Sequence, residues 1–268
     1  MADQHSNVPE VNQELEDYIS RLYRNVPKDI RTCPHWVVWR YEKRKGSEKP
    51  AKVPYFPREG RRADITNADD LIGLGAAVSY LRASHQTESP FDGVGFALTA
   101  DDQFAGIDLD HCRDPQTCEI EGWALDIINR LAGYTEVSPS GTGIRIFIWA
   151  TLEKGHKIGD VEVYFKDRYL TVTGSHVEGT PETIEERQAE VEALVAEIQI
   201  SRHEAAEAAL GAGLTKKTCE INNDRNNLVF QTVSATFGVS GGRRNAYFFT
   251  PTPVRRFTRY GSQQQLHS

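Results

Sequence analysis

Apolar residues follow two spacings along this chain, one typical of helices and the other of strands. Apolar positions three or four residues apart predict helices over residues 11–22, 69–83 and 121–132. A longer, Glu-rich helix is predicted from Thr180 to about residue 210, with Thr180 as its N-cap and Pro181 in its first turn. Short apolar or alternating runs predict strands at residues 36–41, 93–99, 104–110, 145–150, 160–165 and 169–173.

The order of these elements predicts an α+β fold, because helices and strands mix without strict β–α–β alternation. We expect an N-terminal helical segment over residues 1–30, a core domain over 31–180 and an acidic helix over 181–213. The remaining residues, 214–268, are rich in Asn, Thr, Gln, Gly and Arg and show no sustained period. They are expected to form a basic, poorly ordered tail.

Charge is unevenly distributed along the 268 residues, although the net charge is only -7. Residues 40–62 contain nine Lys or Arg against three Glu, and residues 214–268 contain eight basic and two acidic residues. Basic segments in an otherwise acidic chain suit a phosphate polymer as partner, although such a run can also be a solvated loop.

Targeting and redox signals point to a cytoplasmic protein. The chain has neither an apolar run long enough to span a membrane nor a signal-peptide pattern, so we expect no membrane partner. The four cysteines form no Cys-x-x-Cys pair and are expected to be reduced.

Two carboxylates, Asp108 and Asp110, stand two residues apart in a predicted strand. Alternate strand residues share a face, so both point to one side while Ile107 and Leu109 point to the other. Neighbouring carboxylates repel each other and raise the pKa of one of them unless a cation neutralises the pair. The pair therefore indicates a divalent-metal site, the alternative being a surface strand end or an Asx turn.

A second candidate site is the segment from Ser140 to Arg145. Flexible turns at Gly141 and Gly143 would let backbone amides approach an anion. Ser140 and Thr142 add hydroxyl donors, and the Arg145 guanidinium can bind phosphate through two N–H groups. The segment can equally be an ordinary glycine hairpin between two strands. It matches neither the P-loop nor the dinucleotide fingerprint.

A third carboxylate lies in the predicted strand at residues 160–165. If Val161 and Val163 face the core, Glu162 faces the opposite side and could complete a metal cage with Asp108 and Asp110. A strand Glu can also simply face solvent. His176, after the next strand, is either a ligand-binding residue or a hydrogen-bonded loop histidine.

Read in order, five motifs resemble the phage and plasmid primase–polymerases of the archaeo-eukaryotic primase superfamily, over about residues 30–190. The motifs are Trp36-Val37-Val38-Trp39, Lys52-Val53-Pro54-Tyr55, Gly106-Ile107-Asp108-Leu109-Asp110-His111, the segment from Tyr134 to Gly143, and the segment from Arg168 to Gly174. The resemblance implies an RRM-like catalytic core over residues 31–180, with a mostly antiparallel sheet and flanking helices.

The resemblance also assigns roles to individual residues. Asp108, Asp110 and Glu162 would be catalytic and hold two Mg²⁺ or Mn²⁺ ions. The residues implied in nucleotide or template binding are Ser140, Gly141, Thr142, Gly143, Arg145, Lys52, Arg168, Thr173 and His176. Many members carry a histidine at the position of Arg145, which leaves the phosphate role of that arginine open.

The implied function is a template-dependent DNA primase and polymerase in phage, plasmid or mobile-element replication. Its substrates would be a single-stranded DNA template and NTP or dNTP. The chain has no P-loop, so either it acts alone, its helicase is a separate protein, or the chain is a shortened relative of a longer protein. Two alternatives stay open: a non-catalytic nucleic-acid or nucleotide-binding module that recruits a helicase, and a metal-dependent nuclease.

Overall fold

The computed structural model describes residues 10–46 and 49–200, and it contains two five-stranded antiparallel sheets. The first sheet has the strand order β10 (Arg168–Val172), β4 (Gly93–Leu98), β1 (Trp36–Glu42), β2 (Ala51–Phe56) and β3 (Arg61–Arg62). The second has the order β6 (Tyr134–Val137), β7 (Ile144–Trp149), β5 (Phe104–Leu109), β9 (Val161–Tyr164) and β8 (His156–Ile158). The α+β class and the antiparallel pairing are confirmed, but the strands form two sheets rather than one.

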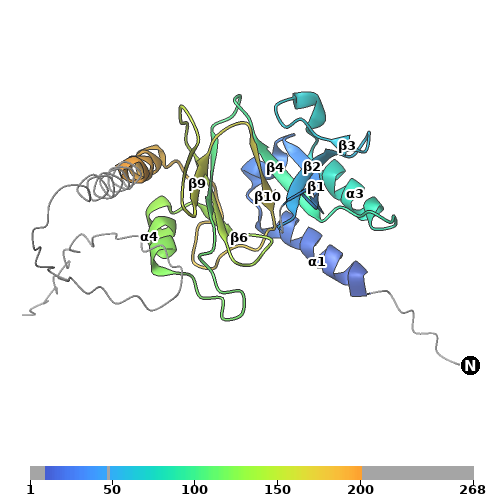
Figure 1. Cartoon of the computed structure of the whole chain (residues 1–268), viewed down its shortest axis with the longest axis horizontal. Helices are drawn as coiled ribbons and strands as arrows, with labels where there is room; N and C mark the ends of the chain where they lie inside the picture. Colours follow the sequence, from blue (N-terminus) through green and yellow to red (C-terminus); the bar gives the residue numbers. More distant parts are fainter. Residues whose placement is uncertain (1–9, 47–48, 201–268) are drawn as a thin grey trace, which may run out of the picture. The chain divides into compact units, whose positions relative to one another are not determined.

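Helices pack on both sheets (Figure 1). They are α1 (Glu10–Asn25), α2 (Lys28–Thr32), α3 (Leu74–Ser84) and α4 (Gly122–Leu131), with a 3-10 turn η1 (Ala68–Asp70) and a further helix over residues 188–200. Helix α3 contacts β1 and β4, and α4 contacts β7. The amphipathic spacing of α1 buries Leu15, Ile19 and Leu22.

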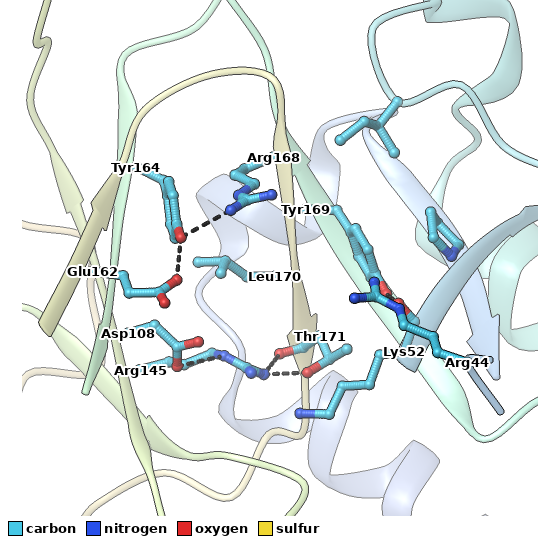
Figure 2. Close-up of a pocket in the computed structure, with 12 residues that line it drawn as sticks. Arg44, Lys52, Asp108, Arg145, Glu162, Tyr164, Arg168, Tyr169, Leu170 and Thr171 are labelled. Atoms are coloured by element: carbon cyan, nitrogen blue, oxygen red, sulfur yellow. Dashed lines mark hydrogen bonds and ion pairs between the residues drawn. The ribbon is translucent and has the colours of Figure 1, made fainter. Parts of the chain in front are cut away.

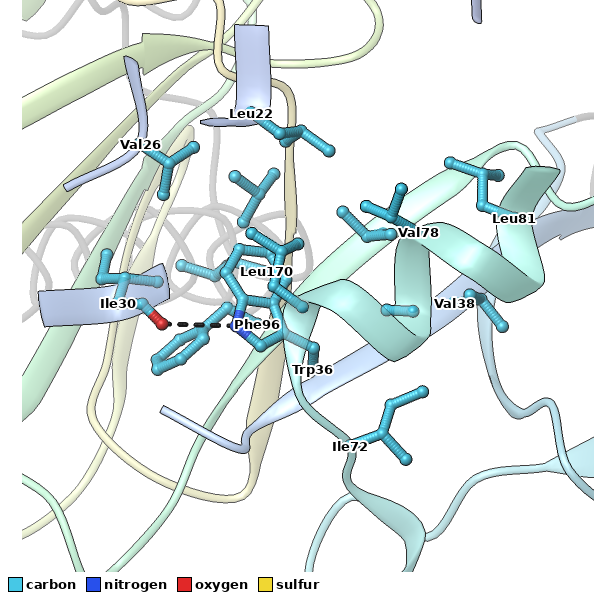
Figure 3. Close-up of a cluster of buried hydrophobic side chains, with 14 of the residues drawn as sticks. Leu22, Val26, Ile30, Trp36, Val38, Ile72, Val78, Leu81, Phe96 and Leu170 are labelled. Carbon is cyan, nitrogen blue, oxygen red and sulfur yellow. Dashed lines mark hydrogen bonds between the residues drawn. The ribbon is translucent and has the colours of Figure 1, made fainter. Parts of the chain in front are cut away.

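Two hydrophobic cores follow from the alternation of the strands. One joins the first sheet to α1, α2 and α3 around Trp36, whose indole donates to the carbonyl of Ile30 at 3.3 Å (Figure 3). The other joins the second sheet to α4 and the helix over residues 188–200, and includes Ile107 and Leu109 of β5. As predicted, these two residues are fully buried, while Asp108 between them is partly exposed.

The two sheets meet through the opposite face of the second sheet. There Phe104 of β5 and Phe147 of β7 join the Trp36 core. Gly106 of β5 allows the close approach of β10, because a Cβ at this position would lie 2.2 Å from Leu170 Cδ1. Further along the same face, apolar residues give way to charged ones.

The six predicted strands are all present within one residue at each end. The predicted helix over residues 69–83 is wrong at its start: η1 comes first and α3 begins at Leu74. Strands β2, β3, β6 and β8 were not predicted. Within the described part of the chain, no helix is long and apolar enough to cross a membrane.

The helix predicted from Thr180 begins only at residue 188. Trp149 at the end of β7 explains the delay, because its amide donates to the Glu185 carbonyl at 2.8 Å and its carbonyl accepts from the Arg187 amide at 3.0 Å. The Thr180 hydroxyl donates to the Val177 carbonyl at 2.8 Å instead of capping a helix. The rest of this helix prediction and the tail at 214–268 lie outside the described residues.

Candidate functional site

One charged residue from each strand of the second sheet falls in a single cross-strand row. The strand register places Glu136 opposite Arg145, Arg145 opposite Asp108, Asp108 opposite Glu162, and Glu162 opposite Lys157. Directly opposite residues share a face of the sheet with Cβ atoms about 5 Å apart. We call these five residues the charged row.

Arg145 forms the buried part of the row. Its side chain is 5% exposed, and its Nε donates to Asp108 Oδ1 at 3.2 Å. Its Nη1 donates to the carbonyl and the hydroxyl of Thr171 on β10 (Figure 2). A buried guanidinium needs such partners, so Arg145 fixes Asp108 and ties the second sheet to the first.

Glu162 has donors on both carboxylate oxygens. Lys157 Nζ donates to Oε1 and the Tyr164 hydroxyl donates to Oε2. Arg168 Nη2 donates to the same Tyr164 hydroxyl at 3.0 Å and its guanidinium lies over the Tyr164 ring (Figure 2). Glu162 is thus held by a cation and a phenol.

Glu136 is fully buried at the other end of the row. Its oxygens accept from the amides of Thr173 at 2.9 Å and Gly174 at 3.0 Å, and from the Tyr134 hydroxyl at 3.2 Å. Burial raises the pKa of Glu136, and these donors together with Arg145 oppose that shift. The sequence offered no direct sign of this buried carboxyl.

Asp110 lies one residue beyond the end of β5, where its amide donates to the Asp160 carbonyl at 2.8 Å. Burial, and then the charge of Asp108, raise the pKa of Asp110. The next residue, His111, has a left-handed backbone (φ 53°) and pairs through Nδ1 with Asp160 Oδ1 at 3.0 Å. Asp160 is thereby directed to His111.

A pocket of about 410 Å³ opens over the charged row and includes Asp108, Arg145 and Glu162 in its lining. The first sheet contributes Lys52 from β2 and Arg168 from β10 to the same pocket (Figure 2). Burial, and then the Arg145 charge, lower the pKa of Lys52 to about 8, although Asp108 and Asp110 oppose the shift. The pocket therefore combines carboxylates with several cations.

The glycine segment forms the hairpin turn between β6 and β7. The amides of Gly141 and Gly143 donate to the Ser138 carbonyl at 2.9 Å and to Ser138 Oγ at 3.2 Å. The Ser140 hydroxyl lies 3.0 Å from the Ser138 hydroxyl and 2.9 Å from the Thr142 hydroxyl. Both glycine amides are thus used inside the loop.

The structure divides the predicted nucleotide-binding residues between two places. Lys52, Arg145 and Arg168 line the pocket over the charged row, whereas Gly141 and Thr173 line a separate pocket of about 330 Å³ beside α1. Thr173 also donates from its hydroxyl to the Val137 carbonyl at 2.7 Å.

His176 has a structural environment. Its ring stacks on Tyr134 with centroids 5.3 Å apart, and its Nε2 lies 3.0 Å from the Thr180 hydroxyl and 3.1 Å from the Pro181 carbonyl. These contacts agree with the alternative of a hydrogen-bonded loop histidine.

Metal binding would require a rearrangement at the three carboxylates. Across residues 10–46 and 49–200, no three His, Cys, Asp or Glu side chains converge as a ready metal cage. Instead, Asp108 is paired with Arg145, and Glu162 is paired with Lys157. The donor set still suits a hard divalent ion, since Asp108 lies directly opposite Glu162 and Asp110 follows Asp108 by two residues.

Sequence reasoning did not select Lys157 and Tyr164 for this site. Both are explained by pairing: Lys157 precedes Glu162 across the β8–β9 turn at Gly159, and Tyr164 follows Glu162 by two residues on the same face. A hairpin drawn around Gly159 would have placed the lysine opposite the glutamate.

The fold and the site define an α+β domain with a pocket of carboxylates and cations between two antiparallel sheets. No protein-family model matches the chain. A DNA primase-polymerase of Nitratiruptor phage NrS-1 is 32% identical over 162 residues, which are 57% of this chain and 21% of that protein. The chain therefore spans about a fifth of the length of this relative. The similarity confirms the resemblance to phage-type primase–polymerases that the motifs indicated.

Proposed function

We propose that this chain is the nucleotidyl-transfer domain of a template-dependent DNA primase–polymerase. The observation that carries the proposal is the placement of Asp108 directly opposite Glu162 in a pocket that Lys52 and Arg168 also line. The similarity to a phage DNA primase-polymerase supports the same reaction class. The two antiparallel sheets with packed helices are compatible with the proposed primase-like core.

Asp108, Asp110 and Glu162 would hold two Mg²⁺ or Mn²⁺ ions in this proposal. Such ions would lower the pKa of an attacking 3′-hydroxyl and neutralise the leaving pyrophosphate. Arg145 orients Asp108 through its Nε, and Tyr164 orients Glu162 through its hydroxyl. The chain's own residues thus fix the direction of two of the three carboxylates.

The triphosphate would lie against the cations of the same pocket. Lys52 and Arg168 reach it from the first sheet, and both can donate to phosphate oxygens. Arg145 contributes positive charge, but its bonds to Asp108 and Thr171 leave it mainly a positioning residue. The pocket at Gly141 would receive a more distant part of the nucleotide or the template.

The single-stranded template would follow exposed basic residues of the first sheet. Lys43, Arg44 and Lys45 are exposed after β1, and Arg44 also lines the pocket over the charged row. Arg61 is held by a bidentate pair with the buried Asp70 and is less available to phosphate. Binding through such residues weakens as salt rises. A separate helicase partner remains part of the proposal.

The test is incorporation of labelled nucleotides on single-stranded DNA, with and without primer, in Mg²⁺ and in Mn²⁺. Asp108→Asn keeps an oxygen for Arg145 Nε and should abolish incorporation, a loss of at least about a hundredfold. Asp160→Asn is the matched control, because Asp160 is a nearby carboxylate directed to His111, and it should retain activity.

The remaining outcomes either contradict the proposal or identify one of the two alternative functions. Full activity of folded Asp108→Asn would contradict the proposal. DNA degradation instead of extension would identify a metal-dependent nuclease. DNA binding without metal dependence or incorporation would identify a binding module that recruits a helicase.

A further inference from the structure

Lys157 occupies the exposed end of the charged row. Its ammonium donates to Glu162 Oε1 from the directly opposite position on the edge strand β8. The Tyr164 hydroxyl donates to the remaining oxygen, and the Glu162 side chain is only 12% exposed. Both oxygens of this nearly buried carboxylate are therefore satisfied by the protein itself.

A lysine ammonium and a divalent ion compete for the same carboxylate oxygen. We infer that Lys157 is an internal counter-ion that occupies the metal-binding position of Glu162 in the free protein and must leave before an ion binds there. The inference rests on the proposed function, because it takes Glu162 as a metal ligand. It adds a residue that controls when the site accepts metal.

The two cations of the row differ in their freedom to move. Arg145 is 5% exposed and fixed by Asp108 and Thr171, so it stays in place. Lys157 is 62% exposed on a strand of three residues, so its ammonium can exchange Glu162 for water, which the buried Arg145 guanidinium cannot do. Only the Lys157 end of the row can therefore open.

This difference has a consequence for the order of binding. In the free protein Lys157 lowers the affinity of the carboxylates for a lone divalent ion. A nucleotide triphosphate carries its own divalent ion and offers the released ammonium another anion. The metal therefore enters most readily together with the nucleotide.

The test is the affinity of the nucleotide-free protein for Mn²⁺ at low salt. Electron paramagnetic resonance measures it through the concentration of free Mn²⁺. Lys157→Gln should bind Mn²⁺ about three- to tenfold more tightly, since a competing charge at a partly exposed site is removed. Lys154→Gln is the matched control: it removes the same charge from the loop before β8, beside a pocket that also contains Glu153 and Glu192, and should leave the affinity unchanged. Glu162→Gln should weaken binding.

The outcomes separate this inference from the proposed function. Unchanged or weaker Mn²⁺ binding by Lys157→Gln, with a clear loss in Glu162→Gln, would overturn the counter-ion role and leave the metal site standing. Equal tightening in Lys154→Gln would assign the effect to overall charge and also overturn the role. If neither Glu162→Gln nor Asp108→Asn altered Mn²⁺ binding, the metal site and the inference would both be wrong. Circular dichroism of each variant verifies that it is folded.

Discussion

Asp110 sits half-buried beside Asp108, and this placement costs stability in the metal-free protein. Burial and the neighbouring carboxylate raise its pKa, so the folded state binds a proton more tightly than the unfolded state does. The charges of His111, Lys157 and Arg145 oppose this shift without cancelling it. The proposed metal-binding role of Asp110 and the stability of the fold therefore conflict.

Asp110→Asn should raise the free energy of unfolding of the metal-free protein by roughly 0.5 kcal/mol at neutral pH. The penalty of a raised carboxyl pKa is present above the folded pKa and disappears below the unfolded value of about 3.9. The gain should therefore shrink as the pH falls toward 4. Urea unfolding of both proteins across this range measures it, and a gain that grew toward acid pH would contradict the explanation.

At the scale of elements, the connection after β10 is held by close backbone approach. Gly174 has φ +65°, and a Cβ there would lie 2.7 Å from the carbonyl carbon of Arg21 and 2.9 Å from the amide nitrogen of Leu22. Its own amide donates to the buried Glu136, and its carbonyl accepts from Asn25 Nδ2 at 2.7 Å. One glycine thus joins α1 to the charged row.

Gly174→Ala should lower the free energy of unfolding by about 3 kcal/mol, because a left-handed backbone and a clash with backbone atoms act together. Gly179→Ala is the matched control: its φ is +84°, but nothing lies within 4 Å of the added Cβ. It should cost only about 1 kcal/mol. Equal losses for the two variants in chemical denaturation would show that the approach of α1 contributes nothing.

The hydrophobic pattern predicted individual strands well and their connections poorly. Alternation around Ile107 and Leu109 was enough to locate β5 and the outward face of Asp108. Strand β2 was missed because Pro54 interrupts its pattern, yet it pairs with β1 at Trp39. In these cases pairing with a neighbouring strand overrode the local signal.

At the scale of the whole molecule, the pocket exists because two sheets face each other. Lys52 belongs to the first sheet and Asp108 to the second, and the burial of Lys52 between them lowers its pKa to about 8. Thr171 of β10 accepts from Arg145 and holds this arrangement in place. Under the proposed function, nucleotide binding should therefore depend on the protonation of Lys52.

The affinity for a non-hydrolysable nucleoside triphosphate should fall as the pH rises through about 8, because Lys52 loses the charge that binds phosphate. Lys52→Met should bind about tenfold more weakly at neutral pH and lose this dependence. Equilibrium titration of both proteins across this pH range provides the measurement. The same slope in Lys52→Met would assign the pH dependence to another group.

The sequence by itself determined the class of the fold and most strands, and it selected Asp108, Asp110 and Glu162 for the proposed site, because side-chain period and residue chemistry are local properties. Only the tertiary structure decided which cations meet these acids, since register is set by pairing between distant strands. Thus Lys157 came to oppose Glu162, and the loop at Gly141 was separated from the pocket of Lys52. Tertiary contacts also moved the start of the helix predicted at Thr180 to residue 188, because Trp149 of β7 bonds to Glu185 and Arg187.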